Sequence, residues 1–563
     1  MGETKLMNRN FEKFRLFACM GLLGLIAAGI TLRFTKITQN QFFYYDEGLY
    51  LEHNIDFLYY LQHHPPDTLK QLGRYLQVSA HMALADTKVL WFFLCDLRAY
   101  LVGADAWYFT RLLSAIFGSL TVLVLYRFAR RFYDSRWVGL FSAALLSIFP
   151  SHLYYSRLGM QEALSTFCFL LGFYFYVIPK KFGWRTFLSS FFFMLAYFTN
   201  YRLVVIPILV GFCEFYTFLR LKQFPDVRKY VWNTLGFVTL VFWVGSIDSG
   251  QHFAVILPWM WHQTNLAEKE AFHWYNLLSY PYFTFRLESL FFGLFFWANF
   301  YHVLKKRWYL LYPFFQVCFQ MLLFSFPEEK GARYVCVVYP FMAMAAAACI
   351  AQLFEDQKNR LIGQVALALG VGLLVGSLAG KSWAIAHAKS EYREAMEYLT
   401  RIDKNIKLVS SQKWVMDLYV ENPNNVQDLP HTFPQMLGMF SRGYRYLVLD
   451  PQTYISWGKN EIRFNPELDN YVAFVVNEVR PIKTFPHFNE VLLERFVLEH
   501  NENLVRSIQF LKLAKEHEFG KIRIYDMAPM IENIMKLMVI QNSQANKPQP
   551  NSPQPSSIEK PKK

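Results

Sequence analysis

The sequence has few charged residues: 18% of its 563 residues are Asp, Glu, Lys or Arg, against 54% that are hydrophobic. A soluble globular domain usually carries about a quarter charged residues, so this balance excludes an ordinary soluble enzyme. The 56 Phe and 34 Tyr residues are typical of a chain embedded in lipid with aromatic belts at the interfaces. The mean hydropathy is only +0.14, so a sizeable part of the chain must nevertheless lie in water.

Several motifs are also missing. The sequence contains no P-loop, no Gly-rich dinucleotide motif and no internal repeat, which disfavours a pump driven by nucleotide hydrolysis. The seven cysteines follow no metal-binding or redox spacing and lie mostly in apolar runs, so we expect small packing residues without disulfides. The net charge of +14 comes in short basic clusters between apolar runs, which indicates a membrane protein rather than one that binds nucleic acid.

The apolar runs predict a polytopic α-helical membrane protein. The first run, 16–32, follows a basic N-terminus and has no small-residue cleavage site, so it is predicted to be an uncleaved span. Ten more runs are long enough to cross a hydrocarbon core of about 30 Å. They cover residues 109–129, 137–155, 163–179, 186–200, 203–219, 231–247, 285–304, 308–326, 335–354 and 361–380.

Basic clusters between alternate runs set the predicted topology. They lie at 127–136, 180–185, 220–229, 305–307 and 358–360. Placing them in the cytoplasm gives about eleven spans, a cytoplasmic N-terminus and an outer C-terminal region. The outer side then receives the loop 34–108, the loop 248–284 and everything after 381. Within the first loop, the apolar stretches Phe57–Tyr60 and Trp91–Leu94 are typical of short interfacial helices.

The C-terminal region has a different pattern and predicts three domains. Strand-like runs at 406–410, 444–449, 471–476 and 521–525 alternate with helical patterns at 392–402 and 504–514. We therefore expect a transmembrane domain over 1–384 and a small extracytoplasmic α/β domain over 385–540. Residues 541–563 are rich in Pro, Ser and Lys and predict a disordered tail.

Two adjacent carboxylates, Asp46 and Glu47, follow the first span in the sequence Tyr45-Asp46-Glu47-Gly48. Taken alone, this pattern allows two interpretations. It fits a solvated turn in which Asp46 caps an amphipathic helix, and it equally fits a pair of acids that serve a site at the membrane surface.

The order of five motifs favours the second interpretation. An acidic pair after the first span resembles the GT-C glycosyltransferases of the protein O-mannosyltransferase and lipid A aminoarabinose transferase kind. The later motifs of those families have counterparts here in the same order, and they are Thr87–Trp91, Gly103 with Arg111–Ser114, Tyr155–Glu162, and Lys330–Tyr334 with Pro340. The resemblance covers roughly residues 15–380. It implies transfer of a hexose or pentose from a polyprenyl phosphate to a protein, lipid or glycan acceptor. We expect a bacterial cytoplasmic membrane, because the sequence shows no recognisable retention signal and is short beside the eukaryotic mannosyltransferases.

The resemblance also implies roles for particular residues. Asp46 is the expected base, and Glu47 and Glu162 are expected to orient the acceptor or to position the site. Lys88, Arg202 and Arg333 are expected to hold the donor phosphate, since fixed cations stabilise the departing charge. His273, Trp274 and Tyr334 are candidates for substrate contacts.

Each of these assignments has a structural alternative. Lys88, Arg202 and Arg333 could extend to lipid headgroups, and Glu162 could simply pair with Arg157. Arg111 is expected to anchor the end of its span or to pair with the first outer loop.

A metal or other cofactor is not expected. Thr87 stands where the aminoarabinose transferases have a metal-binding Glu. The histidines at 252, 262 and 273 lack a helical ligand spacing.

The same pattern of membrane spans is compatible with two other functions. A transporter or flippase of a lipid-linked or anionic solute would place ionisable groups in the middle of its spans. In this sequence Glu214 is the one acid well inside an apolar run, and it lies near the cytoplasmic end. An oligosaccharide ligase or polymerase would share the donor and the membrane face but would carry its motifs in a different order.

Overall fold

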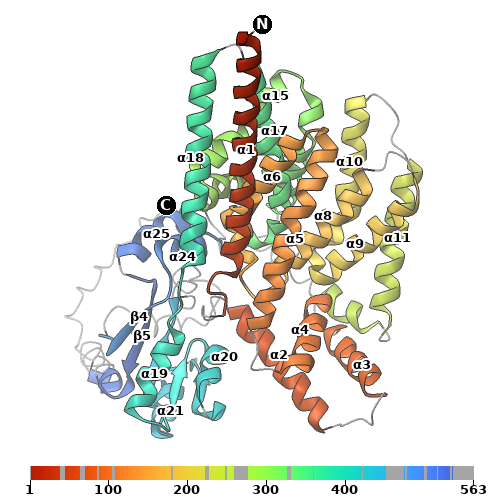
Figure 1. Ribbon diagram of the computed structural model, residues 1–563. Helices are drawn as coiled ribbons and strands as arrows, with labels where there is room; N and C mark the ends of the chain where they lie inside the picture. The colour runs from red at the N-terminus through yellow and green to blue at the C-terminus, as the bar shows by residue number, and fades with distance from the viewer. Residues whose placement is uncertain are drawn as a thin grey trace, which may run out of the picture. The chain divides into compact units, whose positions relative to one another are not determined.

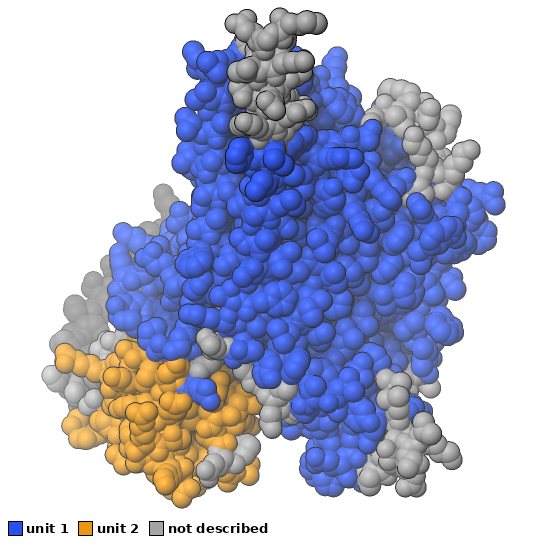
Figure 2. All heavy atoms as spheres, viewed as in Figure 1, with its two compact units in different colours: residues 1–393, 486–521 blue, residues 394–485, 522–563 orange. Residues whose placement is uncertain are grey.

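A computed structural model of the chain describes most of its residues. The described residues are 2–38, 45–63, 70–84, 88–103, 108–178, 182–221, 227–247, 250–258, 277–325, 331–358, 360–420, 422–430, 432–451, 475, 479–499, 504–516, 518–532 and 535–536. They form two compact units (Figure 2). The helical unit comprises Met1–Arg393 with Pro486–Lys521, and the sheet unit comprises Glu394–Phe485 with Ile522–Lys563. The predicted α/β domain, 385–540, differs from this division because its residues 486–521 group with the helical unit.

The helical unit contains a helix at each of the eleven predicted apolar runs (Figure 1). The helices are α1 (Gly2–Phe34), α5 (Tyr108–Tyr133), α6 (Arg136–Ser147), α8 (Glu162–Val177), α9 (Trp184–Thr199), α10 (Ile206–Leu221), α11 (Val227–Gly245), α14 (Leu290–Trp297), α15 (Asn299–Leu304), α16 (Tyr312–Leu323), α17 (Tyr339–Asp356) and α18 (Leu361–Ala386). Among the described residues, five helical stretches are long and apolar enough to cross a membrane: Leu16–Phe34, Tyr108–Tyr133, Tyr201–Leu219, Ala332–Asp356 and Leu361–Ala386. The predicted polytopic helical fold is therefore confirmed.

Some predicted spans are broken. Pro150 starts a separate short helix, α7 (Pro150–Tyr155), because proline fits a first helical turn but cannot continue the preceding helix. A π-helical turn, η4 (Thr284–Glu288), ends at Ser289, whose hydroxyl then caps α14 by accepting the Phe292 N–H at 2.9 Å. Short 3-10 helices, η2 (Tyr201–Val205) and η6 (Ala332–Val338), precede α10 and α17. These breaks divide or shorten four of the predicted spans.

Three short helices of the first predicted outer loop pack together at one end of the bundle (Figure 1). They are α2 (Tyr45–His63), α3 (Lys70–Leu84) and α4 (Val89–Val102). Their common centre is the fully buried Asp96, which accepts hydrogen bonds from Asn54 at 3.0 Å and from Ser79 at 2.9 Å. One carboxylate therefore joins all three helices.

Replacing Asp96 by alanine is expected to loosen these helices. The Asn54 amide and the Ser79 hydroxyl would each lose a buried acceptor, at a cost of about 1–3 kcal/mol per group. Thermal unfolding of the purified protein in detergent measures the loss. Asp56→Ala, at an exposed position of α2, is the matched control and should leave the midpoint unchanged. An equal effect of both substitutions would contradict the role of Asp96.

The sheet unit has an α/β architecture, as the sequence predicts. Its strands are β1 (Leu408–Ser410), β2 (Val426–Asp428), β3 (Tyr446–Leu449), β4 (Lys483–Pro486) and β5 (Lys521–Asp526), in the order β2-β1-β3-β5-β4. β1 is parallel to β2 and β3, whereas β5 is antiparallel to β3. The helices α19 (Tyr392–Ile402), α20 (Lys413–Met416) and α21 (Phe433–Ser441) precede or connect the first strands. The predicted strand at 471–476 lies almost wholly outside the described residues, as does the predicted tail.

Candidate functional site

Glu47 is held firmly at the start of α2. The Arg111 guanidinium of α5 donates from Nε to Oε1 at 2.8 Å and from Nη2 to Oε2 at 2.9 Å, and the Gly159 backbone N–H donates to Oε1 at 2.6 Å. Glu47 and Arg111 are 4% and 1% exposed. A bidentate pair of this kind fixes direction as well as distance. Arg111 thus pairs with the first loop, one of its two predicted roles.

Only glycine fits at position 159, because a side chain there would collide with its neighbours. A Cβ atom added there would lie 2.6 Å from the Thr110 hydroxyl oxygen and 3.1 Å from Oε1 of Glu47. The turn between α7 and α8 can therefore approach the carboxylate only because residue 159 has no side chain. Asp46 is the second residue of α2, and its side chain lies outside what the structure describes.

A chain of hydrogen bonds joins Lys88 to Glu162. The Lys88 ammonium donates to the Tyr50 hydroxyl at 2.5 Å and lies 4.7 Å from the centre of the Tyr50 ring. The Tyr50 hydroxyl donates to Oε1 of Gln161 at 2.8 Å, and the Gln161 amide donates to Oε1 of Glu162 at 3.2 Å. Two of the predicted site residues are therefore connected through two neutral polar residues. Glu162 opens α8 and is 2% exposed.

Arg157, the alternative partner predicted for Glu162, makes its hydrogen bonds elsewhere. Arg157 donates to backbone carbonyl groups of Leu32, Thr35 and Ala386, at 2.5, 2.9 and 3.0 Å, rather than to a carboxylate among the described residues. It joins the end of α1 to the end of α18. Glu162 is therefore not held in place by Arg157.

Arg202 and Arg333 meet at one aromatic ring. The guanidinium carbon of Arg202 lies 4.0 Å from the centre of the Tyr334 ring, and that of Arg333 lies 5.3 Å from it. Arg202 is positioned by the Asn200 side chain, which accepts the Arg202 backbone N–H at 3.2 Å. Three predicted substrate-binding residues, from two distant parts of the chain, are thereby brought together.

The hydrogen-bond chain from Lys88 to Glu162 meets the segment that carries Arg333 and Tyr334 at the start of α8. The Cys336 thiol of η6 lies 3.9 Å from the backbone oxygen of Glu162. The segment that carries Arg333 and Tyr334 therefore packs against the residue that ends the Lys88 hydrogen-bond chain. The two groups together contain buried carboxylates and three cations, which are the side-chain types that accept protons and bind phosphate.

The loop 248–284, called the histidine loop because it carries His252, His262 and His273, lies mostly outside the described residues. His273 and Trp274 lie outside the described residues, as do His262 and Thr87. His252 is 1% exposed, and its Nε2 atom lies 3.2 Å from the Tyr197 hydroxyl, inside the helical unit. Among the described residues, no group of three or more His, Cys, Asp or Glu side chains could hold a metal ion.

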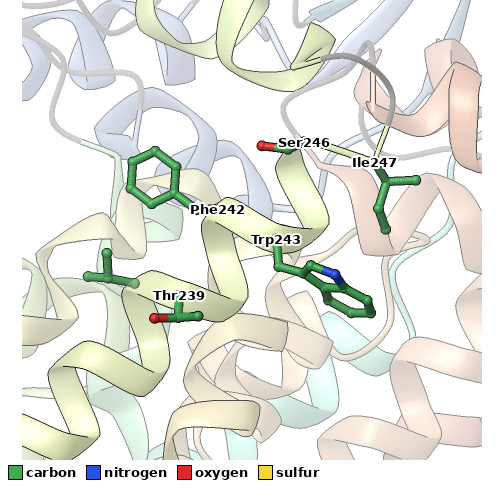
Figure 3. A pocket seen from close by; sticks show the side chains of 6 residues that line it. Thr239, Phe242, Trp243, Ser246 and Ile247 are labelled. Carbon is green, nitrogen blue, oxygen red and sulfur yellow. The ribbon is translucent and has the colours of Figure 1, made fainter.

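A pocket on α11 has a different character (Figure 3). It is lined by Val238, Thr239, Phe242, Trp243, Ser246 and Ile247. All of these residues belong to α11 or directly follow it, and none of them is ionisable. The residues that line this pocket are therefore mainly apolar, unlike the acidic and basic residues described above.

Comparisons with known proteins show which sequences and folds the chain resembles. Residues 18–199 match the sequence model of the dolichyl-phosphate-mannose-protein mannosyltransferase family. That segment contains Asp46, Glu47, Lys88, Arg111 and Glu162. No curated protein sequence matches the chain.

Solved structures match over most of the chain. ArnT from Cupriavidus metallidurans in the apo state is 15% identical, with a TM-score of 0.52 and 78% of this chain and 94% of that chain covered. The same protein bound to undecaprenyl phosphate gives a TM-score of 0.49 at 13% identity, over 78% and 94% of the two chains. The apo oligosaccharyltransferase of Archaeoglobus fulgidus is 10% identical, with a TM-score of 0.50 and coverage of 79% and 72%. The chain therefore has the GT-C glycosyltransferase fold, and residues 18–199 resemble the dolichyl-phosphate-mannose-protein mannosyltransferases.

Proposed function

We propose that the chain transfers a sugar from a polyprenyl-phosphate donor to an acceptor on the outer face of the cytoplasmic membrane. The observation that carries this proposal is the junction at the start of α8, where the hydrogen-bond chain from Lys88 ends at the buried Glu162 and where η6, with Arg333 and Tyr334, packs. The match of residues 18–199 to a family named for a dolichyl-phosphate sugar donor supports the same lipid class.

The proposed reaction forms one bond and breaks one bond. The acceptor hydroxyl attacks the anomeric carbon, and its proton passes to the Asp46 carboxylate. The bond between the anomeric carbon and the phosphate oxygen breaks, and its electron pair remains on the phosphate. The charge on that oxygen grows during the reaction, so the three cations favour the transition state over the bound donor.

The close pairing of Glu47 with Arg111 supports different roles for the two adjacent acids, Asp46 and Glu47. Oε1 and Oε2 of Glu47 both accept hydrogen bonds from Arg111, so this carboxylate is already occupied. We therefore assign proton transfer to Asp46 and the placement of α2 to Glu47.

A transfer assay tests the proposal. Membranes that contain the protein are incubated with polyprenyl-phosphate-linked hexoses or pentoses whose sugar is radiolabelled. We expect label to move from the lipid phosphate to an acceptor, with release of free polyprenyl phosphate. Asp46→Asn should slow this transfer by about a hundredfold or more, whereas a metal chelator should leave it unchanged. Movement of the intact labelled lipid across the vesicle membrane, without cleavage, would instead identify a transporter or flippase.

A further inference from the structure

A helix from the C-terminal part of the helical unit carries a buried cation. In α24 (Glu490–Glu499), Arg495 and Glu499 are each 1% exposed. Nη1 of Arg495 donates to Oε1 of Glu499 at 2.8 Å and to the Ser151 hydroxyl of α7 at 2.8 Å. The guanidinium also lies 5.1 Å from the centre of the Tyr154 ring. A helix distant in sequence is thus anchored on α7 by its charge.

A second carboxylate completes the network. Glu288, which is 2% exposed, accepts the Ser151 backbone N–H at 3.1 Å and also bonds the Ser151 hydroxyl. Ser151 therefore stands between Glu288 and the Arg495 guanidinium. Burial alone would lower the Arg495 pKa, but the nearby Glu499 and Glu288 raise it above its ordinary value, so Arg495 remains a cation.

Burying these charges to attach a helix has a large cost in desolvation free energy. Removing an ion from water costs several kcal/mol even after relaxation, and a well-packed apolar contact often stabilises a protein as much or more. Burial accordingly raises the Glu499 pKa. Stability alone is therefore a weak reason for these charges, and the neighbours of α24 indicate what else they do.

The C-terminal end of α24 contacts the segment that carries the predicted phosphate ligands. The backbone oxygen of Glu499 would lie only 3.3 Å from a Cβ atom added to Gly331, the residue directly before η6. The Glu499 carboxylate also lies within electrostatic range of Arg333. At its other contact, Arg495 holds α7, which leads into the turn whose Gly159 binds Glu47.

We infer that Arg495 and Glu499 form a positioning pair for the candidate site. The pair fixes η6, and with it Arg333 and Tyr334, against α7 and the turn that holds Glu47. This inference rests on the proposed function, because Arg333 is taken as a ligand of the donor phosphate. Neither residue of the pair is assigned a contact with substrate.

The test uses three variants of the full-length protein in detergent. Glu499→Gln keeps the shape and an acceptor for Arg495 but removes one buried charge. Arg495→Lys keeps the charge but loses the fork geometry. Arg495→Met combined with Glu499→Gln removes both charges. The matched control, Lys512→Met with Glu516→Gln, changes an exposed pair with the same four-residue spacing on α25 (Leu504–Glu516).

The readouts separate positioning from stability. We measure the melting temperature, the dissociation constant for undecaprenyl phosphate, and kcat and KM for donor and acceptor per folded molecule. The double variant should weaken undecaprenyl phosphate binding and raise the donor KM by about tenfold, the equivalent of one lost ligand contact, with little change in acceptor KM. Arg495→Lys should recover part of the loss, and the control should match the wild type.

The possible failures are distinguishable. Variants that melt earlier but retain the dissociation constant and donor KM of the wild type would show that α24 is only a structural support. If the double variant does not fold, the two single variants decide the question by the same constants. A wild-type protein that neither binds undecaprenyl phosphate nor cleaves any lipid-linked sugar would overturn both the proposed function and this inference.

Discussion

Replacement of Asp46 by asparagine is expected to lower turnover by about a hundredfold or more, because general-base catalysis contributes roughly that factor. The amide has nearly the shape of the carboxylate but cannot accept the proton of the acceptor hydroxyl at neutral pH. Donor binding depends on the lipid and on the phosphate cations, so the dissociation constant for polyprenyl phosphate should barely change. Single-turnover transfer assays and direct lipid binding measure the two quantities separately.

Asp56→Asn provides the matched control for this substitution. It makes the same chemical change on the same helix, α2, at an exposed position. Turnover near the wild-type value is expected for this control. If Asp46→Asn were equally active in a well-folded protein, proton transfer would have to be assigned to Glu47, Glu162 or the histidine loop. Our site would then be wrong although the fold would stand.

The helical fold was predictable because the bilayer imposes a length on each apolar run. All eleven runs correspond to helices, since a span of fixed thickness leaves a long apolar signal. The breaks at Pro150 and Ser289 were not predicted as separate elements. A short turn inside an apolar run changes hydropathy very little, and so the run appears continuous in sequence.

The candidate site was predictable only where residues are charged and follow a known order of motifs. Glu47, Lys88 and Glu162 were identified in this way, and the structure connects them to partners. Tyr50 and Gln161 were missed because neutral polar residues occur throughout such a chain.

The ion pair of α24 was missed for a different reason. Glu499 follows Arg495 by four residues, and in sequence this spacing is typical of an exposed pair on a helix surface. Only the packing of α24 against α7 and Gly331 makes the pair a buried one.

The pair of Glu47 and Arg111 gives the second large expected effect. Arg111→Met removes one partner of a buried ion pair and leaves the carboxylate uncompensated, which should destabilise the protein by about 3–5 kcal/mol. Glu47→Gln combined with Arg111→Met removes both charges of this buried pair and preserves an oxygen to accept the Gly159 N–H. This double variant should therefore recover most of the lost stability in a thermal unfolding measurement.

Recovered stability should not restore catalysis. The first turn of α2 carries both Asp46 and Glu47, and the two hydrogen bonds from Arg111 fix its direction. A neutral pair lacks this bidentate contact, so Asp46 would no longer be held at the geometry that proton transfer requires. We expect the stable double variant to transfer sugar at least about tenfold more slowly than the wild type. Full activity in a stable double variant would show that the ion pair serves folding alone and does not position Asp46.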